Sequence, residues 1–392
     1  MGIFLLILGT AVIALLAAER IHALRCRRAL THVIHVNGTR GKSGVARLIA
    51  AGLREAGIKT WCKTTGTLPM TIDTAGCEHL IRRRGPANIS EQIRSLSAAV
   101  RDGAEVAVIE CMAVDPELQY VCEHRILHSD IGVITNARVD HVAEMGGSVA
   151  EVTEAMSATV PDGREVRRLL RRQDMETVLF TADQECAAGL RDRAAALDTG
   201  LVLADKAPEG AEYGRFVFPE NIALALAVCE RCGVPRDQAL RGFERVQEDP
   251  YAVSAHDLPG DITFVDIMSA NDPASTGLIM DRFPCDGHRV YILNCRSDRG
   301  YRTELMLELI ERRAPDEVWL IGAGRRAALR HLRRRGVPAS AFASAGELPV
   351  FAHEDGAVLP PGTYIYAIGN IAGPGFELMK LIGEEEESCM HR

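Results

Sequence analysis

The sequence has no excess of positive charge. Its 45 Lys and Arg residues are outnumbered by 53 Asp and Glu residues, which gives a formal net charge of -8. A general nucleic-acid binder needs a basic surface that neutralises phosphates, so this balance argues against a nucleic-acid partner. The arginine runs at residues 82–84 and 333–335 are instead expected on solvated faces.

The 11 cysteines form no framework of paired spacings. Cys229 and Cys232 alone have the C-x-x-C spacing, and no second pair stands nearby to complete a zinc site. Scattered free thiols are typical of a protein in a reducing cytoplasm.

The amino-terminal segment lacks charge. Residues 2–18 are almost wholly apolar, and these 17 residues lie at the short end of the range for a membrane-spanning helix. Arginines follow at positions 20, 25, 27 and 28 and nothing basic precedes, so the positive-inside rule places the body of the protein in the cytoplasm. We expect residues 1–22 to be an uncleaved single-pass anchor in the cell membrane. A cleaved signal peptide is the alternative, because Ala17 and Ala18 are small.

A glycine-containing turn follows the first β-branched apolar run, at residues 33–36. The turn contains Gly38, Thr39, Arg40, Gly41, Lys42 and Ser43. Residues 44–53 continue with apolar side chains at helical spacing, which predicts strand, turn and helix. The free N–H groups at such a helix start suit a phosphate, Lys42 adds a cation, and the Ser43 hydroxyl can bind Mg²⁺.

The turn departs from the complete phosphate-loop pattern at one position. G-x-x-x-x-G-K-[ST] requires Gly where this chain has Val36. The alternative is an ordinary strand-to-helix turn that happens to contain Gly-Lys-Ser. We favour the phosphate loop, because strand, turn and helix all lie where the mechanism needs them.

Two later strands also end in polar side chains. Residues 104–110 form an apolar run that ends at Glu110, and residues 130–134 precede Asn136, Asp140 and His141. Ligands bind at the carboxyl edge of a doubly wound sheet, and carboxylates there can hold a metal ion. The sequence therefore predicts a metal site formed by Ser43, Glu110 and His141.

A polar turn at residues 64–67 follows another predicted strand. Thr64, Thr65 and Thr67 would lie at the same edge, where they are candidate substrate contacts. A plain turn is the alternative.

The strand and helix alternation starts afresh near residue 251. Apolar strands at residues 261–266, 290–294, 317–322 and 364–370 alternate with helical segments. We expect an α/β chain with three parts: an anchor helix at 1–22, an ATP-binding P-loop domain with a mostly parallel sheet at 23–250, and a smaller Rossmann-like α/β domain at 251–392.

The ordered set of motifs resembles the Mur ligase superfamily, the ATP-dependent amide ligases of cell-wall and folate polyglutamate synthesis. The matching pieces are residues 38–43, Glu110, Thr135 and Asn136 with Asp140 and His141, Glu220 and Asn221 before an alanine-rich helix, and Asp266 with residues 271–273. Cell-wall members carry a UDP-sugar domain before the phosphate loop, for which this chain has no room. A membrane-anchored, two-domain member is similar to the ligase subunits of poly-gamma-glutamate synthases.

The resemblance implies an ADP-forming ligase that uses ATP and Mg²⁺. The terminal carboxylate of poly-gamma-glutamate would be phosphorylated, and the amine of a glutamate would displace the phosphate. Lys42 would hold the terminal phosphates, Ser43 and Glu110 one metal ion, and Glu110 with His141 a second. The nucleotide would also be contacted by Asn136, Asn221, Asp266 and Asn271, with domain closure completing the site. Arg296 or Arg299 would replace an arginine that relatives place on the gamma phosphate.

Two other functions remain open at this stage. A folylpolyglutamate synthetase belongs to the same superfamily, although the anchor speaks against it. A membrane-tethered NTPase without a covalent product would also carry the phosphate loop. Because one short helix cannot form a channel for an anionic polymer, membrane partner subunits are expected. The sequence leaves homo-oligomerisation open.

Overall fold

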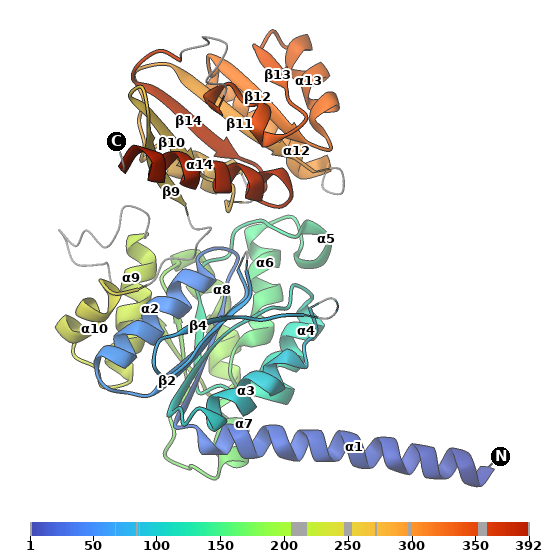
Figure 1. The fold of residues 1–392 in the computed structure, drawn as a ribbon. Helices are drawn as coiled ribbons and strands as arrows, with labels where there is room; N and C mark the ends of the chain where they lie inside the picture. Colours follow the sequence, from blue (N-terminus) through green and yellow to red (C-terminus); the bar gives the residue numbers. More distant parts are fainter. Residues whose placement is uncertain are drawn as a thin grey trace. The chain divides into compact units, whose positions relative to one another are not determined.

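The computed structural model describes residues 2–66, 68–83, 85, 87–204, 218–246, 253–270, 273–296, 300–351 and 359–390. The chain divides into two compact units, residues 1–249 and 250–392, and each unit has its own β-sheet. Figure 1 shows the elements of both units, coloured along the sequence.

Helix α1 (Gly2–Ala29) extends beyond the anchor of residues 1–22 expected from the sequence. It projects from unit 1, and apolar side chains on its first half, such as Phe4 and Leu15, are exposed. The segment Leu6–Ala29 is long and apolar enough to cross a membrane, and it is the one such candidate in the described part of the chain.

The carboxyl end of α1 is built into unit 1 by a buried ion pair. Arg27 is fully buried, and its Nη2 atom lies 2.6 Å from Oδ1 of Asp130. Its Nε–H donates to the carbonyl of His128 at 2.9 Å. Asp130 also accepts hydrogen bonds from His32 Nδ1 and from the backbone N–H of Val33. The anchor helix therefore joins the domain through its core.

The sheet of unit 1 has eight strands in the order β4-β3-β2-β5-β1-β6-β7-β8. The β2–β3 and β3–β4 pairs at one edge are antiparallel, and the other pairs are parallel. The strands are β1 (His32–Asn37), β2 (Thr60–Thr64), β3 (Met70–Ile72), β4 (Glu78–Leu80), β5 (Val106–Glu110), β6 (Ile131–Ile134), β7 (Val178–Thr181) and β8 (Gly200–Leu203).

The central strand β1 determines which segments meet at the carboxyl edge. It pairs with β5 on one side, where Val36 lies opposite Glu110, and with β6 on the other, where Asn37 lies opposite Ile134. Because the three strands are parallel and in this register, the residues after each of them come together at one edge.

Helices cover both faces of this sheet (Figure 1). They are α2 (Lys42–Glu55), α3 (Glu91–Arg101), α4 (Pro116–Val121), α5 (Val142–Met145), α6 (Val149–Met156), α7 (Gly163–Leu170), α8 (Gln184–Ala196), α9 (Pro219–Arg231) and α10 (Arg236–Phe243). A π-helical turn, η1 (Cys122–Leu127), follows α4, and a 3₁₀ turn, η2 (Ser157–Thr159), follows α6.

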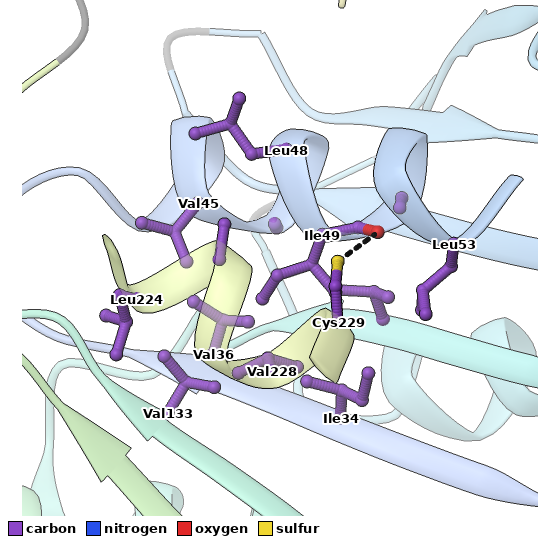
Figure 2. Close-up of a cluster of buried hydrophobic side chains, with 14 of the residues drawn as sticks. Ile34, Val36, Val45, Leu48, Ile49, Leu53, Val133, Leu224, Val228 and Cys229 are labelled. Atoms are coloured by element: carbon purple, nitrogen blue, oxygen red, sulfur yellow. Dashed lines mark hydrogen bonds between the residues drawn. The ribbon is translucent and has the colours of Figure 1, made fainter. Parts of the chain in front are cut away.

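The core on one face lies between the central strands and the helices α2, α9 and α10. Ile34 and Val36 of β1 alternate onto this face and pack against Ile49 of α2 and Val228 of α9 (Figure 2). Figure 2 also shows Cys229, whose thiol donates to the Ile49 carbonyl at 3.8 Å. The packing fixes α2, and with it the turn that precedes α2.

Unit 2 has a six-stranded sheet in the order β13-β12-β11-β14-β10-β9, in which only the β10 and β9 pair is antiparallel. Its strands are β9 (Ser254–Leu258), β10 (Ile262–Asp266), β11 (Arg289–Cys295), β12 (Glu317–Gly322), β13 (Ala339–Ala341) and β14 (Thr363–Ile368). Its helices are α11 (Pro273–Met280), α12 (Gly300–Arg313), α13 (Arg325–Arg334) and α14 (Pro374–Met390), with 3₁₀ turns η4 (Ala345–Glu347) and η5 (Pro349–Phe351).

The described arginines of both runs are exposed, as expected from the sequence. Arg333 and Arg334 lie on α13. Arg83 is exposed as well, and it makes a bidentate pair with Glu91 at 2.8 and 3.0 Å. Arg84 lies outside the described residues.

Candidate active site

The turn between β1 and α2 has a backbone that requires glycine at two positions. Gly38 has φ 138° and Gly41 has φ 79°, which are conformations that side chains disfavour. A Cβ atom on Gly38 would lie 1.9 Å from Oγ1 of Thr135. A Cβ atom on Gly41 would lie 2.8 Å from Nδ2 of Asn221, so the amide of Asn221, from α9, rests directly against the turn.

The segment after β6 holds the turn in shape. Oδ1 of Asn136 accepts from the Thr39 hydroxyl at 2.8 Å and from the Arg40 backbone N–H at 3.2 Å. The Thr135 hydroxyl and the Asn136 amide both donate to the Arg40 carbonyl, at 2.6 and 3.1 Å. Thr135 was named from the sequence as part of the motif after this strand, but no role was assigned to it, since its contact is with a turn 95 residues earlier.

The amino end of α2 is open toward an anion. Its N-cap is Gly41, which has no side chain to bond the first N–H groups, so these donors and the helix dipole are available to a phosphate. The Lys42 ammonium curls back and donates to the Gly38 carbonyl at 2.7 Å. The cation is thereby held over the turn.

Glu110 connects three segments at the carboxyl edge. Its Oε2 atom accepts from the Ser43 hydroxyl at 2.8 Å and from the Thr65 backbone N–H at 2.6 Å. The residue is 2% exposed, so its carboxylate is held in one orientation. A serine hydroxyl beside a carboxylate is the hard oxygen donor set that Mg²⁺ prefers.

A buried ion pair between Lys63 and Glu91 is linked to Glu110 through Gln92, and it was not predicted from the sequence. Lys63 of β2 is fully buried, donates to Gln92 at 2.9 Å and lies 3.4 Å from Glu91. Gln92 in turn donates to the Glu110 carbonyl at 3.2 Å. Burial lowers the pKa of Lys63, and the Glu91 carboxylate counteracts part of that shift.

His141 lies in the loop after β6, in the left-handed region with φ 50°. Its Nε2 atom is 3.6 Å from Oδ2 of Asp140, and the same oxygen accepts from Arg40 Nη1 at 3.0 Å. The loops after β1 and β6 are therefore linked through Asp140.

The threonine turn is only partly within the described residues. Thr65 contributes its backbone N–H to Glu110, a role that its residue type did not indicate. The Thr64 hydroxyl is buried and has no hydrogen-bond partner in the described part of the chain. Thr67 lies outside that part.

In unit 2, Asp266 closes strand β10 with an almost fully buried carboxyl group. Its Oδ1 atom accepts from the Met268 N–H at 2.8 Å, while Oδ2 has no partner among the described residues. Burial raises its pKa to about 7, and the Met268 hydrogen bond offsets this only in part. Arg296 Nη1 lies 3.5 Å from Oδ1 of Asn370, whereas Asn271 and Arg299 lie outside the described residues.

Two family models match the chain. The Mur ligase middle domain matches residues 36–188, and the poly-gamma-glutamate synthase CapB C-terminal domain matches residues 254–385. The first covers the turn, Glu110 and His141, and the second covers Asp266.

Two curated proteins are similar in sequence. The PGA synthase CapB of Bacillus subtilis (strain 168) is 35% identical over 318 residues, which are 77% of this chain and 77% of that protein. The capsule biosynthesis protein CapB of Bacillus anthracis is 35% identical over 284 residues, which are 69% of this chain and 58% of that protein. The chain therefore spans less than two thirds of the Bacillus anthracis protein.

Solved structures show the same fold. Folylpolyglutamate synthase of Mycobacterium tuberculosis, complexed with ADP, has a TM-score of 0.66 at 17% identity, over 93% of each chain. The bifunctional folylpolyglutamate synthase/dihydrofolate synthase of Yersinia pestis, complexed with AMPPNP and Mn ion, has the same score, identity and coverage. The predicted fold class is confirmed.

Fold, phosphate-loop geometry and family matches together define an ATP-dependent amide ligase of the Mur type. The chain belongs to the CapB family of poly-gamma-glutamate synthases. The superfamily and the poly-gamma-glutamate branch predicted from the sequence are thus both confirmed.

Proposed function

We propose that this protein extends poly-gamma-glutamate with ATP at the carboxyl edge of the unit 1 sheet. The observation that carries the proposal is the junction at Glu110, where a buried carboxylate joins the Ser43 hydroxyl at the start of α2. The names of the two CapB relatives support poly-gamma-glutamate as the product.

Nucleotide and metal are assigned to the turn and its neighbours. Solved relatives of the same fold hold ADP, or AMPPNP with Mn ion, which supports a nucleotide and a divalent cation here. We assign the cation as Mg²⁺, held by Ser43 and Glu110, with His141 as the candidate ligand of a second ion. When bound, it offsets negative charge on the phosphates. The phosphates would accept from the backbone of residues 38–43 and from Lys42.

The reaction has two steps that this geometry suits. An oxygen of the terminal carboxylate attacks the gamma phosphorus of ATP, the bond to the bridging oxygen breaks, and ADP leaves. The neutral amine of a glutamate then attacks the acyl carbon, phosphate departs, and the nitrogen releases a proton as the amide forms. Lys42 stabilises charge on the transferring group, and the Glu110 carboxylate keeps Ser43 aligned.

Further contacts are proposed from the other elements. Asn221 is the candidate adenine contact, since its amide lies against Gly41, and Asn136 supports the phosphates by holding Arg40. From unit 2, Asp266 is the candidate ribose contact, because Oδ2 is buried without a partner in the described chain. Asn271 is a further nucleotide candidate, and Thr64, Thr65, Thr67, Arg296 and Arg299 are the substrate candidates.

The protein is proposed to be a single-pass protein of the cell membrane with its catalytic units in the cytoplasm. The exposed apolar face of α1 and the arginines near its carboxyl end support this orientation. Membrane partner subunits are proposed for export of the polymer, since one helix forms no channel.

The test uses membranes that carry the full chain, with ATP and radiolabelled glutamate, with and without the partner subunits. The proposal expects label to enter a protease-resistant polymer of high mass in step with phosphate release. Phosphate release that depends on a folate would instead support a folylpolyglutamate synthetase. ATP turnover with no polymer under any of these conditions would support a tethered NTPase.

A further inference from the structure

One cluster of metal-binding side chains lies apart from the hard oxygen donors of the active site. His35, Cys111 and Cys122 place a ring nitrogen and two thiol sulfurs within 4.8 Å of one another. They come from strand β1, from the residue after β5 and from η1. Their exposed fractions are 1%, 2% and 0%, so the cluster is closed to bulk solvent.

Glu123 orients the histidine. Its Oε2 atom lies 2.8 Å from Nδ1 of His35 and also accepts from the Ser129 hydroxyl at 2.9 Å. Oε1 accepts from the Ser129 backbone N–H at 2.9 Å. The carboxylate is an acceptor, so Nδ1 carries a proton, and Nε2, which lies 3.6 Å from Sγ of Cys122, is the nitrogen that is left for a metal ion. Histidines that bind metals are oriented by carboxylates in this way.

The π-helical turn η1 brings Cys122 and Glu123 to the same imidazole. These two consecutive residues address opposite nitrogens of the ring, the carboxylate at Nδ1 and the thiol at Nε2. Such turns insert an extra residue into a helix and are frequent at functional sites. The geometry is thus specific to the ring of His35 and is not a chance proximity of thiols.

We propose that His35, Cys111 and Cys122 bind one thiophilic metal ion. Two sulfurs and one imidazole select Zn²⁺ or Cu⁺ over Mg²⁺. Ligand atoms 3.6 Å apart suit an ion at roughly 2.0–2.3 Å from each of them. Among the described residues, Cys229 and Cys232 belong to no such group of three ligands.

The site has a structural consequence for the ligase. Cys111 directly follows Glu110, and its N–H donates to the Val36 carbonyl at 2.8 Å. An ion held there ties the end of β5 to β1 and η1 from the side opposite α2. It is a second metal site, different in donor chemistry from the one at Ser43 and Glu110, and it does not depend on which substrate the ligase uses.

The test measures metal content of the full chain, purified in detergent under reducing conditions after exposure to Zn²⁺ or, separately, Cu⁺. Native mass spectrometry and elemental analysis are expected to find one ion per chain with at least one of the two metals. Co²⁺ loading should give a thiolate-to-cobalt charge-transfer band. If the reduced wild-type protein retains neither ion and shows no such band, the proposal is overturned.

Variants then assign the ligands. Cys111→Ser and Cys122→Ser are expected to weaken binding at least 10-fold, and Glu123→Gln by about 10–100-fold through loss of histidine orientation. Cys186→Ser is the matched control, since this buried thiol of α8 lies in the same unit outside the cluster. Circular dichroism checks folding. A folded Cys122→Ser variant that binds as tightly as the control would place the ion elsewhere and contradict the assignment.

Discussion

The Ser43 hydroxyl donates a 2.8 Å hydrogen bond to Glu110, a residue 67 positions later in the chain. The contact joins the start of α2 to the end of β5, and the backbone of Thr65 adds a third segment through the same carboxylate oxygen. One buried carboxylate thus aligns the elements on which the proposed cation and phosphates depend.

Removing the negative charge of the Glu110 carboxylate should weaken binding of the cation that ATP turnover requires. Glu110→Gln retains size and a hydrogen-bond acceptor but loses a hard anionic ligand, so we expect the Mg²⁺ concentration for half-maximal ATP turnover to rise at least ~10-fold. A magnesium titration of phosphate release measures this. Glu105→Gln, at an exposed position before β5, is the control. An unchanged magnesium requirement in Glu110→Gln would remove Glu110 from the metal site.

Lys42→Ala should abolish polymer synthesis without unfolding the protein. The Lys42 ammonium is half-buried over the turn, where it would offset negative charge on the phosphates and is not part of the hydrophobic core. We therefore expect the rate of polymer synthesis to fall about 10²–10³-fold. Glutamate incorporation by membranes is the assay, with thermal unfolding as the folding check. Lys59→Ala, at an exposed site before β2, should retain full activity. Polymer synthesis at wild-type rate by Lys42→Ala would refute the proposed role of the phosphate loop.

Removing one partner of the ion pair between Arg27 and Asp130 should lower the free energy of unfolding substantially. Burial alone would raise the pKa of Asp130, but the Arg27 charge and hydrogen bonds from His32 and Val33 hold that pKa below its ordinary value. Arg27→Met leaves the buried carboxylate without its cation and with the hydrogen bonds from His32 and Val33 alone, and breaking a buried pair on one side typically costs about 3–5 kcal/mol of unfolding free energy. Denaturant unfolding in detergent tests this against Arg25→Met, an exposed position on the same helix.

The double variant Arg27→Met with Asp130→Leu sharpens that test. Removing both charges eliminates the desolvation penalty, so much of the lost stability should return. A single variant that is no less stable than Arg25→Met would show that the pair contributes nothing to unit 1.

Asp266 should make stability depend on pH. Its pKa is about 7 in the folded chain and near 3.8 when unfolded, so the folded state binds the extra proton between these values. Stability should therefore fall as pH rises from about 4 to 7, by up to about 4 kcal/mol at about 1.4 kcal/mol per pKa unit. Thermal unfolding of Asp266→Asn, which cannot ionise, should lack this component. The stability of the variant minus that of wild type should be larger at pH 8 than at pH 5.

Asp257→Asn controls for the charge change, because Asp257 is exposed on the neighbouring strand β9. It should keep the wild-type slope of stability against pH. Parallel slopes for wild type and Asp266→Asn would mean that the Asp266 carboxyl titrates near its ordinary value.

The local pattern was sufficient to predict the core of unit 1. The run at residues 33–36 and the helical spacing after Ser43 correspond to β1 and α2, because a short β-branched apolar run is typical of a buried strand and apolar residues at helical spacing are typical of a helix. Val36, where the complete motif has Gly, is fully buried under α2 and α9, so the departure reflects packing.

Other features depend on partners distant in the chain. Lys63 is a charged residue within a buried strand, and nothing local indicates that Gln92 and Glu91 compensate it. Strands β3 and β4 have three residues each, too few to show a period. The cluster around His35 could not be predicted from the local sequence either, because its neighbours Cys111 and Cys122 come from other elements.

The join between α1 and β1 is short. The helix ends at Ala29 and the strand begins at His32, while Arg27 is already locked inside the domain. In the proposed membrane arrangement, α1 is therefore a rigid connection between the membrane and unit 1, with no long flexible linker between them. Unit 1 would stay at a constant height above the lipid, so diffusion in the plane of the membrane would bring its catalytic edge to a membrane partner always at the same height.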